Sequence, residues 1–355
     1  MTKNNKSNIF DFTKPNTFGF TSSWAENFDP EGNYVLTKRR RVNLKEFPAR
    51  SMRTGKETSI FLRNEQGLKE GLSSGAGSSI VDINGRPIKI KRNGYKENGP
   101  ESSKPFKTVN KGKTEIVPYR GILSLEQALG EYQAIKKLKE ENLCSAYTPI
   151  DILEYIIPGT EKKAYALITE INSDVRIDEV IFGLHGAVIA DKVRKKELVF
   201  DQKKGLFTLE GLVHEGFNDG TLEEDLYKLG YSLGSFYKEF HAKGWVRGYP
   251  HSWFGNEVLN SDGTISFVDL EDATNTFKDE VLQKKQRLDR YQAQSALVAE
   301  FEHLGIEALT YNAVIIADAF SEAYNSCSSP RPLPKNVVER FKENTLKANK
   351  VLWRE

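Results

Sequence analysis

An asparagine and an aspartate in the C-terminal half have the types and spacing of a divalent-metal site. Asn256 lies in a loop bounded by glycine and aromatic residues, and Asp269 follows the apolar run Ile265-Ser-Phe-Val268. Between them, Asn260-Ser-Asp-Gly263 predicts a hairpin turn. A side-chain amide and a carboxylate on adjoining loops can hold Mg²⁺ or Mn²⁺ against the phosphates of a nucleotide.

Two lysines and a glutamate earlier in the chain can supply further parts of a nucleotide site. Lys89 and Lys91 alternate along a predicted strand, so both point to one face. One lysine could reach a phosphate while the other is solvated. Glu131, near the middle of the next predicted helix, could hold the lysine in place. The alternative for each residue alone is a surface charge.

A glycine-rich segment and an arginine are further candidates for phosphate contacts. In Gly71-Leu-Ser-Ser-Gly-Ala-Gly77 the backbone at Gly75 and Gly77 could approach a polyphosphate. Ile80 stands where the pattern G-x-G-x-x-G has its third glycine, so a plain strand connection is the alternative. Arg120 could bind phosphate through its planar guanidinium, or be a solvated loop arginine.

The elements that must position these residues change in type along the chain. Apolar alternation predicts strands at 59–63, 79–83, 87–91, 150–157 and 164–171, with an Asn84-Gly85 hairpin turn and one helix at 124–139 that Ser124 caps. Helical spacing then predicts helices at 221–242, 277–304, 306–324 and 335–352. The sequence therefore predicts an α+β chain with a β-rich half and a helical half.

Composition limits the classes of function. The 355 residues carry 51 Lys and Arg against 49 Asp and Glu, and a net charge of +2 indicates neither a polyanion binder nor an acidic solvating protein. Cys144 and Cys327 are far apart, which argues against a disulfide framework. No signal peptide or apolar run long enough to span a bilayer occurs, so we expect a cytoplasmic protein without membrane contact.

Residues 1–57 are polar and rich in Asn, Thr, Lys and Arg, which predicts an irregular N-terminal arm. Within 38–56 the charged residues are basic except Glu46, so this segment could contact nucleic acid or acidic protein surfaces. A solvated basic segment is favoured over nucleic acid, because no nucleic-acid-binding motif accompanies the charge. An interaction protein that uses this arm is one alternative function.

From 59 to 325 the chain resembles the protein kinase-like superfamily. Leu222–Gly244 resembles the helix that leads to the catalytic loop, and Asp269-Leu-Glu stands in the place of Asp-Phe-Gly. The resemblance implies a bilobal fold, with a small β-rich N-lobe at 58–171 and a larger helical C-lobe at 172–355. The catalytic-type loop would be 241–272, and ATP with Mg²⁺ or Mn²⁺ would be the cofactors.

The catalytic Asp of that superfamily is missing. Counted back from Asn256 as in H-R-D-x-x-x-x-N, its position holds His251, and Tyr249-Pro250 replace His-Arg. Aligned instead with H-G-D-x-H-x-x-N, Arg247-Gly-Tyr249 stands for His-Gly-Asp, with two extra residues before Asn256. His251 is therefore the candidate general base, because imidazole titrates near neutral pH; a loop histidine bonded to backbone is the alternative.

A shorter resemblance is to the selenoprotein O group. It rests on Pro87-Ile-Lys-Ile-Lys91 and on Arg120 through Glu131, which are similar to that group's strand lysine, arginine and helix. That group lacks the catalytic Asp and transfers AMP to protein hydroxyls. The sequence thus predicts a metal-dependent transferase that moves a phosphoryl or adenylyl group from ATP to a protein or small-molecule acceptor. The alternative is an inactive pseudokinase that binds a nucleotide or a partner.

Overall fold

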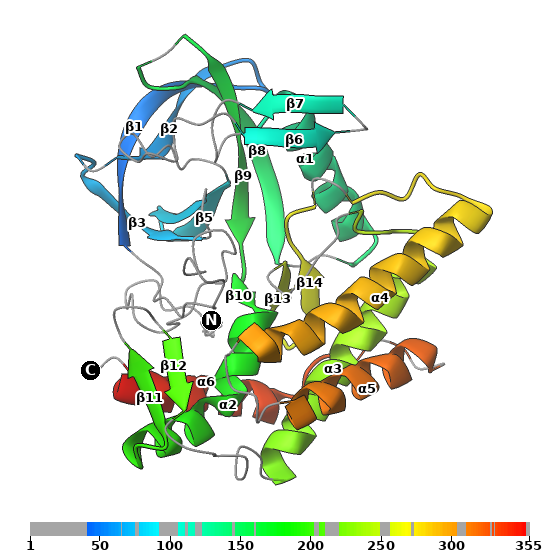
Figure 1. The fold of residues 1–355 in the computed structure, drawn as a ribbon. Coiled ribbons are helices and arrows are strands. Elements are labelled where there is room, and N and C mark those ends of the chain that lie inside the picture. The colour runs from blue at the N-terminus through cyan, green and yellow to red at the C-terminus, as the bar shows by residue number, and fades with distance from the viewer. Residues whose placement is uncertain are drawn as a thin grey trace, which may run out of the picture. The chain divides into compact units, whose positions relative to one another are not determined.

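The chain forms two compact units, which we call the barrel unit (Arg39–Glu140 and Tyr147–Ile171) and the helical unit (141–146 and 172–355). Figure 1 shows their helices and strands. The structure, a computed structural model, describes residues 41–64, 66–74, 78–91, 106–110, 113–117, 123–143, 146–159, 161–201, 206–209, 220–248, 256–270, 273–303, 310–326, 329 and 331–352.

The barrel unit is built on one antiparallel sheet. Its strands are β1 (Arg41–Ser51), β2 (Glu57–Arg63), β3 (Lys69–Ser73), β4 (Ser79–Ile83), β5 (Arg86–Lys91), β8 (Tyr147–Ile156) and β9 (Lys163–Ile171). Their order is β2-β1-β3-β4-β5-β9-β8, and a further β1–β8 pairing closes six of them into a barrel. Aliphatic side chains from these strands fill the interior, as the predicted alternation requires.

Strand β1 is the seam of the barrel. β2 pairs along one edge of β1, whereas β3 and β8 pair with the other edge near its two ends. The connection from β2 to β3 must therefore cross β1, and it does so at Leu44. A Cβ at Gly67 would lie 2.3 Å from the carbonyl carbon of Leu44, so only glycine fits this crossing.

The predicted irregular arm is corrected at its C-terminal end, because Arg41–Ser51 is strand β1. Val42, Leu44, Phe47 and Ala49 face or approach the core, and the charged residues between them are exposed. Adjacent basic residues and a change of phase between Leu44 and Phe47 hide this alternation. Residues 1–40, including Lys38 to Arg40 of the basic run, lie outside the described residues.

One long helix occurs among the described residues of the barrel unit, and it begins as the sequence predicts. α1 spans Leu125–Glu140. The Ser124 hydroxyl accepts a hydrogen bond from the Gln127 backbone at 3.2 Å, and the Gln127 side chain accepts one from the Ser124 backbone at 3.0 Å. This reciprocal pair is a capping box. A separate hairpin joins β6 (Phe106–Asn110) to β7 (Lys113–Val117).

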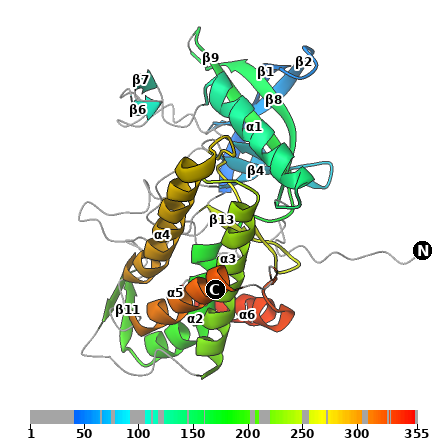
Figure 2. The same ribbon diagram turned by 90° about the vertical axis from the view of Figure 1, so that its right-hand side faces the viewer.

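The helical unit contains five long helices and two short sheets among its described residues. The helices are α2 (Ile177–Arg194), α3 (Gly220–Ala242), α4 (Asp279–His303), α5 (Thr310–Asn325) and α6 (Lys335–Leu352). Strands β10 (Val175–Arg176), β13 (Glu257–Leu259) and β14 (Ile265–Phe267) form one sheet, and β11 (Leu198–Asp201) pairs with β12 (Leu206–Leu209). Figure 2 shows α3 beside α5 and α2 beside α6.

Small residues set the close approach of α3 and α5. A Cβ at Gly230 would lie 2.3 Å from the carbonyl oxygen of Ile316, and one at Gly234 would lie 2.1 Å from that of Phe320. Neither site can accept a side chain without moving α5. The two helices therefore pack backbone against backbone, which places the C-terminal end of α3 firmly in the unit.

The α+β prediction is confirmed. The Asn84-Gly85 turn is also confirmed, with positive φ at both residues as a two-residue hairpin of this type requires. The sequence did not predict a closed barrel, and a six-stranded barrel is not a clear kinase-like N-lobe, so the bilobal kinase-like part of the prediction is not confirmed.

A neutral histidine lies buried between α2 and α5. His185 Nδ1 lies 2.7 Å from the Ile181 carbonyl oxygen, to which it donates, and His185 Nε2 accepts from the Asn312 amide at 2.9 Å. Burial lowers the pKa of His185 from 6.5 to about 4, although the hydrogen bond to Ile181 opposes the shift. The imidazole is therefore neutral in the folded chain at neutral pH.

This histidine predicts an acid-sensitive fold. Below pH 6.5 His185 binds a proton in the unfolded chain but not in the folded chain. Protonation therefore favours the unfolded chain, and the free energy of unfolding decreases as the pH falls toward 4. The decrease in the free energy of unfolding should approach about 3 kcal/mol. Urea unfolding of the wild type and of His185→Gln between pH 6.5 and pH 4 measures this decrease. If the free energy of unfolding falls equally steeply with pH in both proteins, His185 is not the group responsible.

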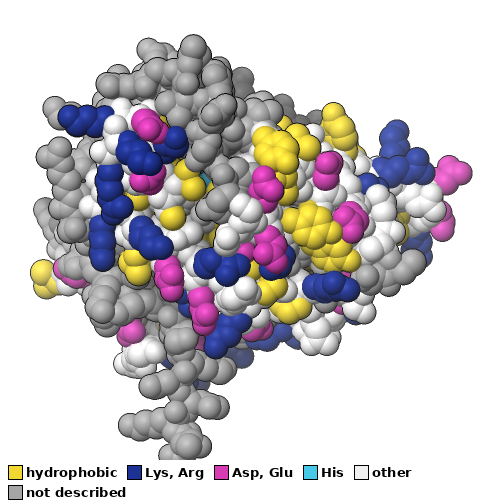
Figure 3. Space-filling model, turned by 90° about the horizontal axis from the view of Figure 1, so that it is seen from below, with side chains coloured by type: hydrophobic (Ala, Val, Ile, Leu, Met, Phe, Trp, Pro, Cys, Tyr) yellow, Lys and Arg dark blue, Asp and Glu magenta, His cyan; other side chains and the backbone are white. Residues whose placement is uncertain are grey.

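One face of the molecule is mixed in character. On the face shown in Figure 3, hydrophobic, basic and acidic side chains are interspersed, with no field of one sign. Among the helices that the structure describes, none is long and apolar enough to cross a membrane.

Candidate nucleotide and metal site

The barrel unit brings together the lysine and the glutamate singled out in the sequence. Lys91 Nζ lies 2.6 Å from Glu131 Oε2, and the two side chains are 5% and 1% exposed. Lys91 ends β5, and Glu131 lies on the buried face of α1 with Ala128 and Ile135. A charge pair so fully removed from water is strongly oriented, because the low dielectric strengthens the interaction between its partners.

Lys89 is not solvated, contrary to one part of the prediction. It is 2% exposed, donates to the Tyr147 hydroxyl at 2.6 Å, and lies 4.8 Å from the centroid of that ring. Both lysines therefore point into the same unit, as strand alternation requires, but each meets its own partner. Tyr147 is 58 positions away from Lys89 in sequence, so no local sequence pattern predicts this contact.

In the helical unit, Asn256 and Asp269 lie at the same end of the β13–β14 hairpin. Glu257 pairs with Phe267, and the next backbone bond runs from Val268 N–H to the Asn256 carbonyl at 2.8 Å. Asp269 follows Val268 directly, and both candidate ligands are half-buried. The predicted hairpin thus places Asn256 opposite Val268, with Asp269 as the next residue of the chain.

Asp269 also has an unusual backbone. Its φ is +57°, in the left-handed region that aspartate and asparagine tolerate better than other residues with a side chain. A sparsely populated conformation persists only where the surrounding structure imposes it, and such residues cluster at functional sites. The backbone thus turns sharply at Asp269, the carboxylate that the sequence predicts to be a metal ligand.

The oxygen donors at Asn256 and Asp269 suit a hard cation. Mg²⁺ and Mn²⁺ prefer oxygen ligands, and Mg²⁺ is commonly held by one or two protein oxygens together with water and phosphate. Among the described residues no group of three or more His, Cys, Asp or Glu side chains could hold a metal ion by itself. The donors present therefore fit an ion that a nucleotide helps to bind.

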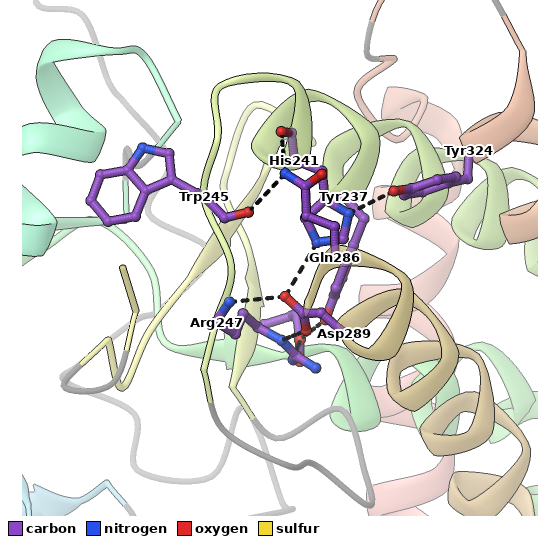
Figure 4. Close-up of polar contacts among 8 residues, drawn as sticks. Tyr237, His241, Trp245, Arg247, Gln286, Asp289 and Tyr324 are labelled. Carbon is purple, nitrogen blue, oxygen red and sulfur yellow. Dashed lines mark hydrogen bonds and ion pairs between the residues drawn. The ribbon is translucent and has the colours of Figure 1, made fainter. Parts of the chain in front are cut away.

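Arg247 is the centre of a buried polar network beside this hairpin (Figure 4). Its Nε donates to Asp289 Oδ1 at 3.0 Å, its backbone N–H donates to Asp289 Oδ2 at 2.8 Å, and its Nη1 donates to Glu257 Oε1. The guanidinium carbon lies 5.0 Å from the ring centroid of Tyr237 and 5.4 Å from that of Phe267. The cation is held by two carboxylates and two aromatic rings.

Helix α3 extends this network. The Tyr237 hydroxyl donates to Glu257 Oε1 at 2.5 Å. His241 contacts Asp289 Oδ2 through Nε2 at 3.2 Å and the Tyr324 hydroxyl through Nδ1 at 2.7 Å. The network therefore ties α3, α4, α5 and the start of β13 to one another.

The end of α3 is fixed by further contacts. Gln286 Nε2 donates to the carbonyl of His241 at 2.6 Å, and its contact with the carbonyl of Trp245 is 3.5 Å (Figure 4). Trp245 Nε1 donates to Glu141 Oε2 at 2.7 Å. Gly244, with φ of +81°, ends the helix as the sequence predicts. The chain thus leaves α3 along a defined path toward Arg247.

The two carboxylates beside Arg247 are shifted in opposite directions. Burial alone would raise the pKa of Asp289, but the hydrogen bond with His241 and the charge of Arg247 more than offset it and hold the pKa at about 2. At Glu257 burial dominates and raises the pKa, although Arg247 opposes the rise. Asp289 is therefore the firmly ionised partner of the arginine.

Sequence reasoning missed Asp289 and Glu257. Asp289 shares the buried stripe of α4 with Ala293, Ala296 and Leu297, at spacings of four, seven and eight residues. A carboxylate on an apolar stripe requires a buried partner, and this signal could have drawn attention to it. Glu257 is the first residue of β13, whose other residues are apolar, so a charge there is equally unexpected.

Four predicted site residues lie outside the described residues. They are Gly75, Gly77, Arg120 and His251. Their roles in binding phosphate or moving a proton stay predictions.

Comparisons with known proteins place the chain in no family. No family model matches it, and no curated protein matches it. Among solved structures, the chain is similar to "WaaP in complex with acyl carrier protein" at 13% identity and a TM-score of 0.33, over 81% of this chain and 88% of that one. At this score and identity the likeness defines neither a fold nor an activity for this chain.

Proposed function

We propose that the chain is an ATP- and divalent-metal-dependent transferase of bilobal kinase-like type. It would move a phosphoryl or adenylyl group to a protein or small-molecule acceptor. The buried ion pair of Lys91 with Glu131 carries the proposal. Burying both charges costs free energy that an apolar pair would not cost, so a role in orienting a cation explains the pair better than stability does.

Lys91 would contact the phosphates of ATP, with Glu131 holding its ammonium group in place. Lys89, fixed by Tyr147, adds positive charge on the same strand. A cation held in one position before the ligand arrives costs no reorganisation during the reaction.

Asn256 and Asp269 would hold the metal ion in this proposal. Oxygen ligands of these types fit Mg²⁺ or Mn²⁺, and the backbone hydrogen bond from Val268 to Asn256 at this end of the hairpin supports the assignment. When bound, such an ion neutralises phosphate charge and aligns the reacting group. His251 is proposed as the base that accepts a proton from the acceptor, and Gly75, Gly77 and Arg120 are proposed to contact phosphate.

Labelled ATP tests the proposal. Incubation of the full chain with Mg²⁺ or Mn²⁺ and ATP labelled at the γ or the α phosphate should leave one label on the chain or on an added acceptor. Transfer of the γ label indicates a phosphoryl group, and transfer of the α label indicates an adenylyl group. Absence of both labels across candidate acceptors would contradict a transferase.

A second candidate function is a nucleotide-binding module without catalysis. The segment Gly248-Tyr-Pro-His-Ser-Trp-Phe-Gly255 contains no Asp or Glu, so it lacks the carboxylate base that the kinase-like pattern has before Asn256. Transfer of either label from ATP would exclude this second candidate, and once transfer is seen His251→Ala tests the proposed base. Full activity of that variant would exclude His251 from proton transfer.

A further inference from the structure

We infer that Arg247 and Glu257 are positioning residues, whose ion pair fixes Asn256 beside Asp269. The consequence for metal binding rests on the proposed function, but the positioning itself does not. The ion pair joins two positions ten residues apart, and these positions enclose the segment 248–256. Asn256 is the last residue of that segment, directly before Glu257.

Both ends of this connection are anchored in regular structure. On one side, Asp289 of α4 accepts hydrogen bonds from both the backbone and the side chain of Arg247. On the other side, Glu257 begins β13 and pairs with Phe267 of β14. With both ends held, the position at which the chain enters the hairpin is fixed.

The position of Asn256 follows from this arrangement. Its carbonyl oxygen accepts the N–H of Val268, the residue that precedes Asp269. Because Asn256 and Glu257 are adjacent, a shift of Glu257 would move Asn256 and weaken the hydrogen bond from the Val268 N–H to the Asn256 carbonyl. The ion pair therefore acts on Asn256 through one peptide unit.

The cost of the network supports a positioning role. Arg247 is 5% exposed and Glu257 is fully buried, yet Arg247 Nη2 and Glu257 Oε2 have no hydrogen-bond partner among the residues that the structure describes. Buried polar atoms are nearly always paired, and well-packed apolar residues often equal or exceed a buried ion pair in stability. A network selected for stability alone would satisfy these atoms or replace them.

The double variant Arg247→Met with Glu257→Leu removes both members of this ion pair, while Asp289 keeps its hydrogen bonds with His241 and with the backbone N–H of residue 247. The matched control is Arg340→Met with Asp225→Leu, which removes the ion pair between α6 and α3 (Arg340 Nε to Asp225 Oδ2, 2.7 Å) in the same unit. Both double variants should remain folded, as circular dichroism and cooperative urea unfolding will show. The control lies outside the candidate site.

Two measurements separate positioning from a general structural effect. Hydrogen exchange of the Val268 amide reports the bond to Asn256 without any nucleotide, and the Asn260 amide, bonded to Thr264 at the turn of the hairpin, is its internal reference. Titration of ATP with Mg²⁺, and with EDTA in its place, reports the metal-dependent part of binding.

We expect the Val268 amide to exchange at least about tenfold faster in the Arg247/Glu257 variant, with Asn260 unchanged in that variant and both amides unchanged in the control. The affinity for ATP with Mg²⁺ should fall about 10–100-fold, as for the loss of outer-shell support, while metal-free binding stays the same.

If the Val268 amide of the Arg247/Glu257 variant exchanges at the wild-type rate, the inference is overturned, whatever the affinity for ATP. An equal rise at Asn260 would also overturn it, because the whole hairpin would then be loosened. If Val268 alone is faster and the wild type binds no ATP, the positioning role stands and the proposed function fails.

Discussion

Replacement of Lys91 by methionine is expected to abolish ATP binding and to lower the free energy of unfolding by about 3–5 kcal/mol. The stability loss arises because Glu131, 1% exposed, would keep a buried charge without the cation 2.6 Å away. The binding loss arises because the proposal assigns Lys91 to the phosphates. The single variant alone cannot separate these two effects.

The double variant Lys91→Met with Glu131→Leu separates them. It removes both charges, so most of the lost stability should return, since an apolar pair of similar volume replaces the ion pair. ATP binding should not return. Urea unfolding and ATP titration of the wild type, the single variant and the double variant measure both quantities. Recovery of ATP binding in the double variant would show that the pair only holds β5 to α1.

Replacement of Asp269 by asparagine is expected to weaken binding of ATP with Mg²⁺ by more than about 100-fold, since loss of outer-shell support alone costs 10–100-fold. Asparagine tolerates the φ of +57° at this position and has nearly the same size, so stability should change little. What is lost is the negative charge that a divalent ion requires.

Asp262→Asn is the matched control for this variant. Asp262 lies in the turn of the same hairpin, is exposed, and accepts the Thr264 N–H at 3.0 Å through a side-chain oxygen that asparagine keeps. ATP titration with Mg²⁺ and with EDTA compares the two variants. If Asp269→Asn and Asp262→Asn bind alike, Asp269 is not a metal ligand.

Local patterns predicted much of this fold. The Asn84-Gly85 turn, the Ser124 cap of α1 and the apolar stripe of α3 each lie within a few residues of the feature that they specify. The spacing from Asn260 to Gly263 likewise gave the β13–β14 hairpin. The pairing of Lys91 with Glu131 spans 40 positions but follows from one strand face and one helix face.

Contacts between distant segments could not be predicted in this way. The barrel is closed where Ala49 pairs with Tyr155, and no single-sequence pattern encodes that register. Asp289 lies 42 positions from Arg247, so the buried polar network around Arg247 could not be predicted from local patterns. In β1 the charged residues concealed a strand, because only half of a strand's side chains need to face the core.

The central claim is that the chain binds ATP through a divalent ion. Calorimetric titration of the full chain with ATP, in Mg²⁺ and again in excess EDTA, tests it most directly. We predict saturable one-to-one binding in Mg²⁺ that is at least about 100-fold weaker in EDTA. The same affinity in both conditions, or no binding in Mg²⁺, would contradict the account.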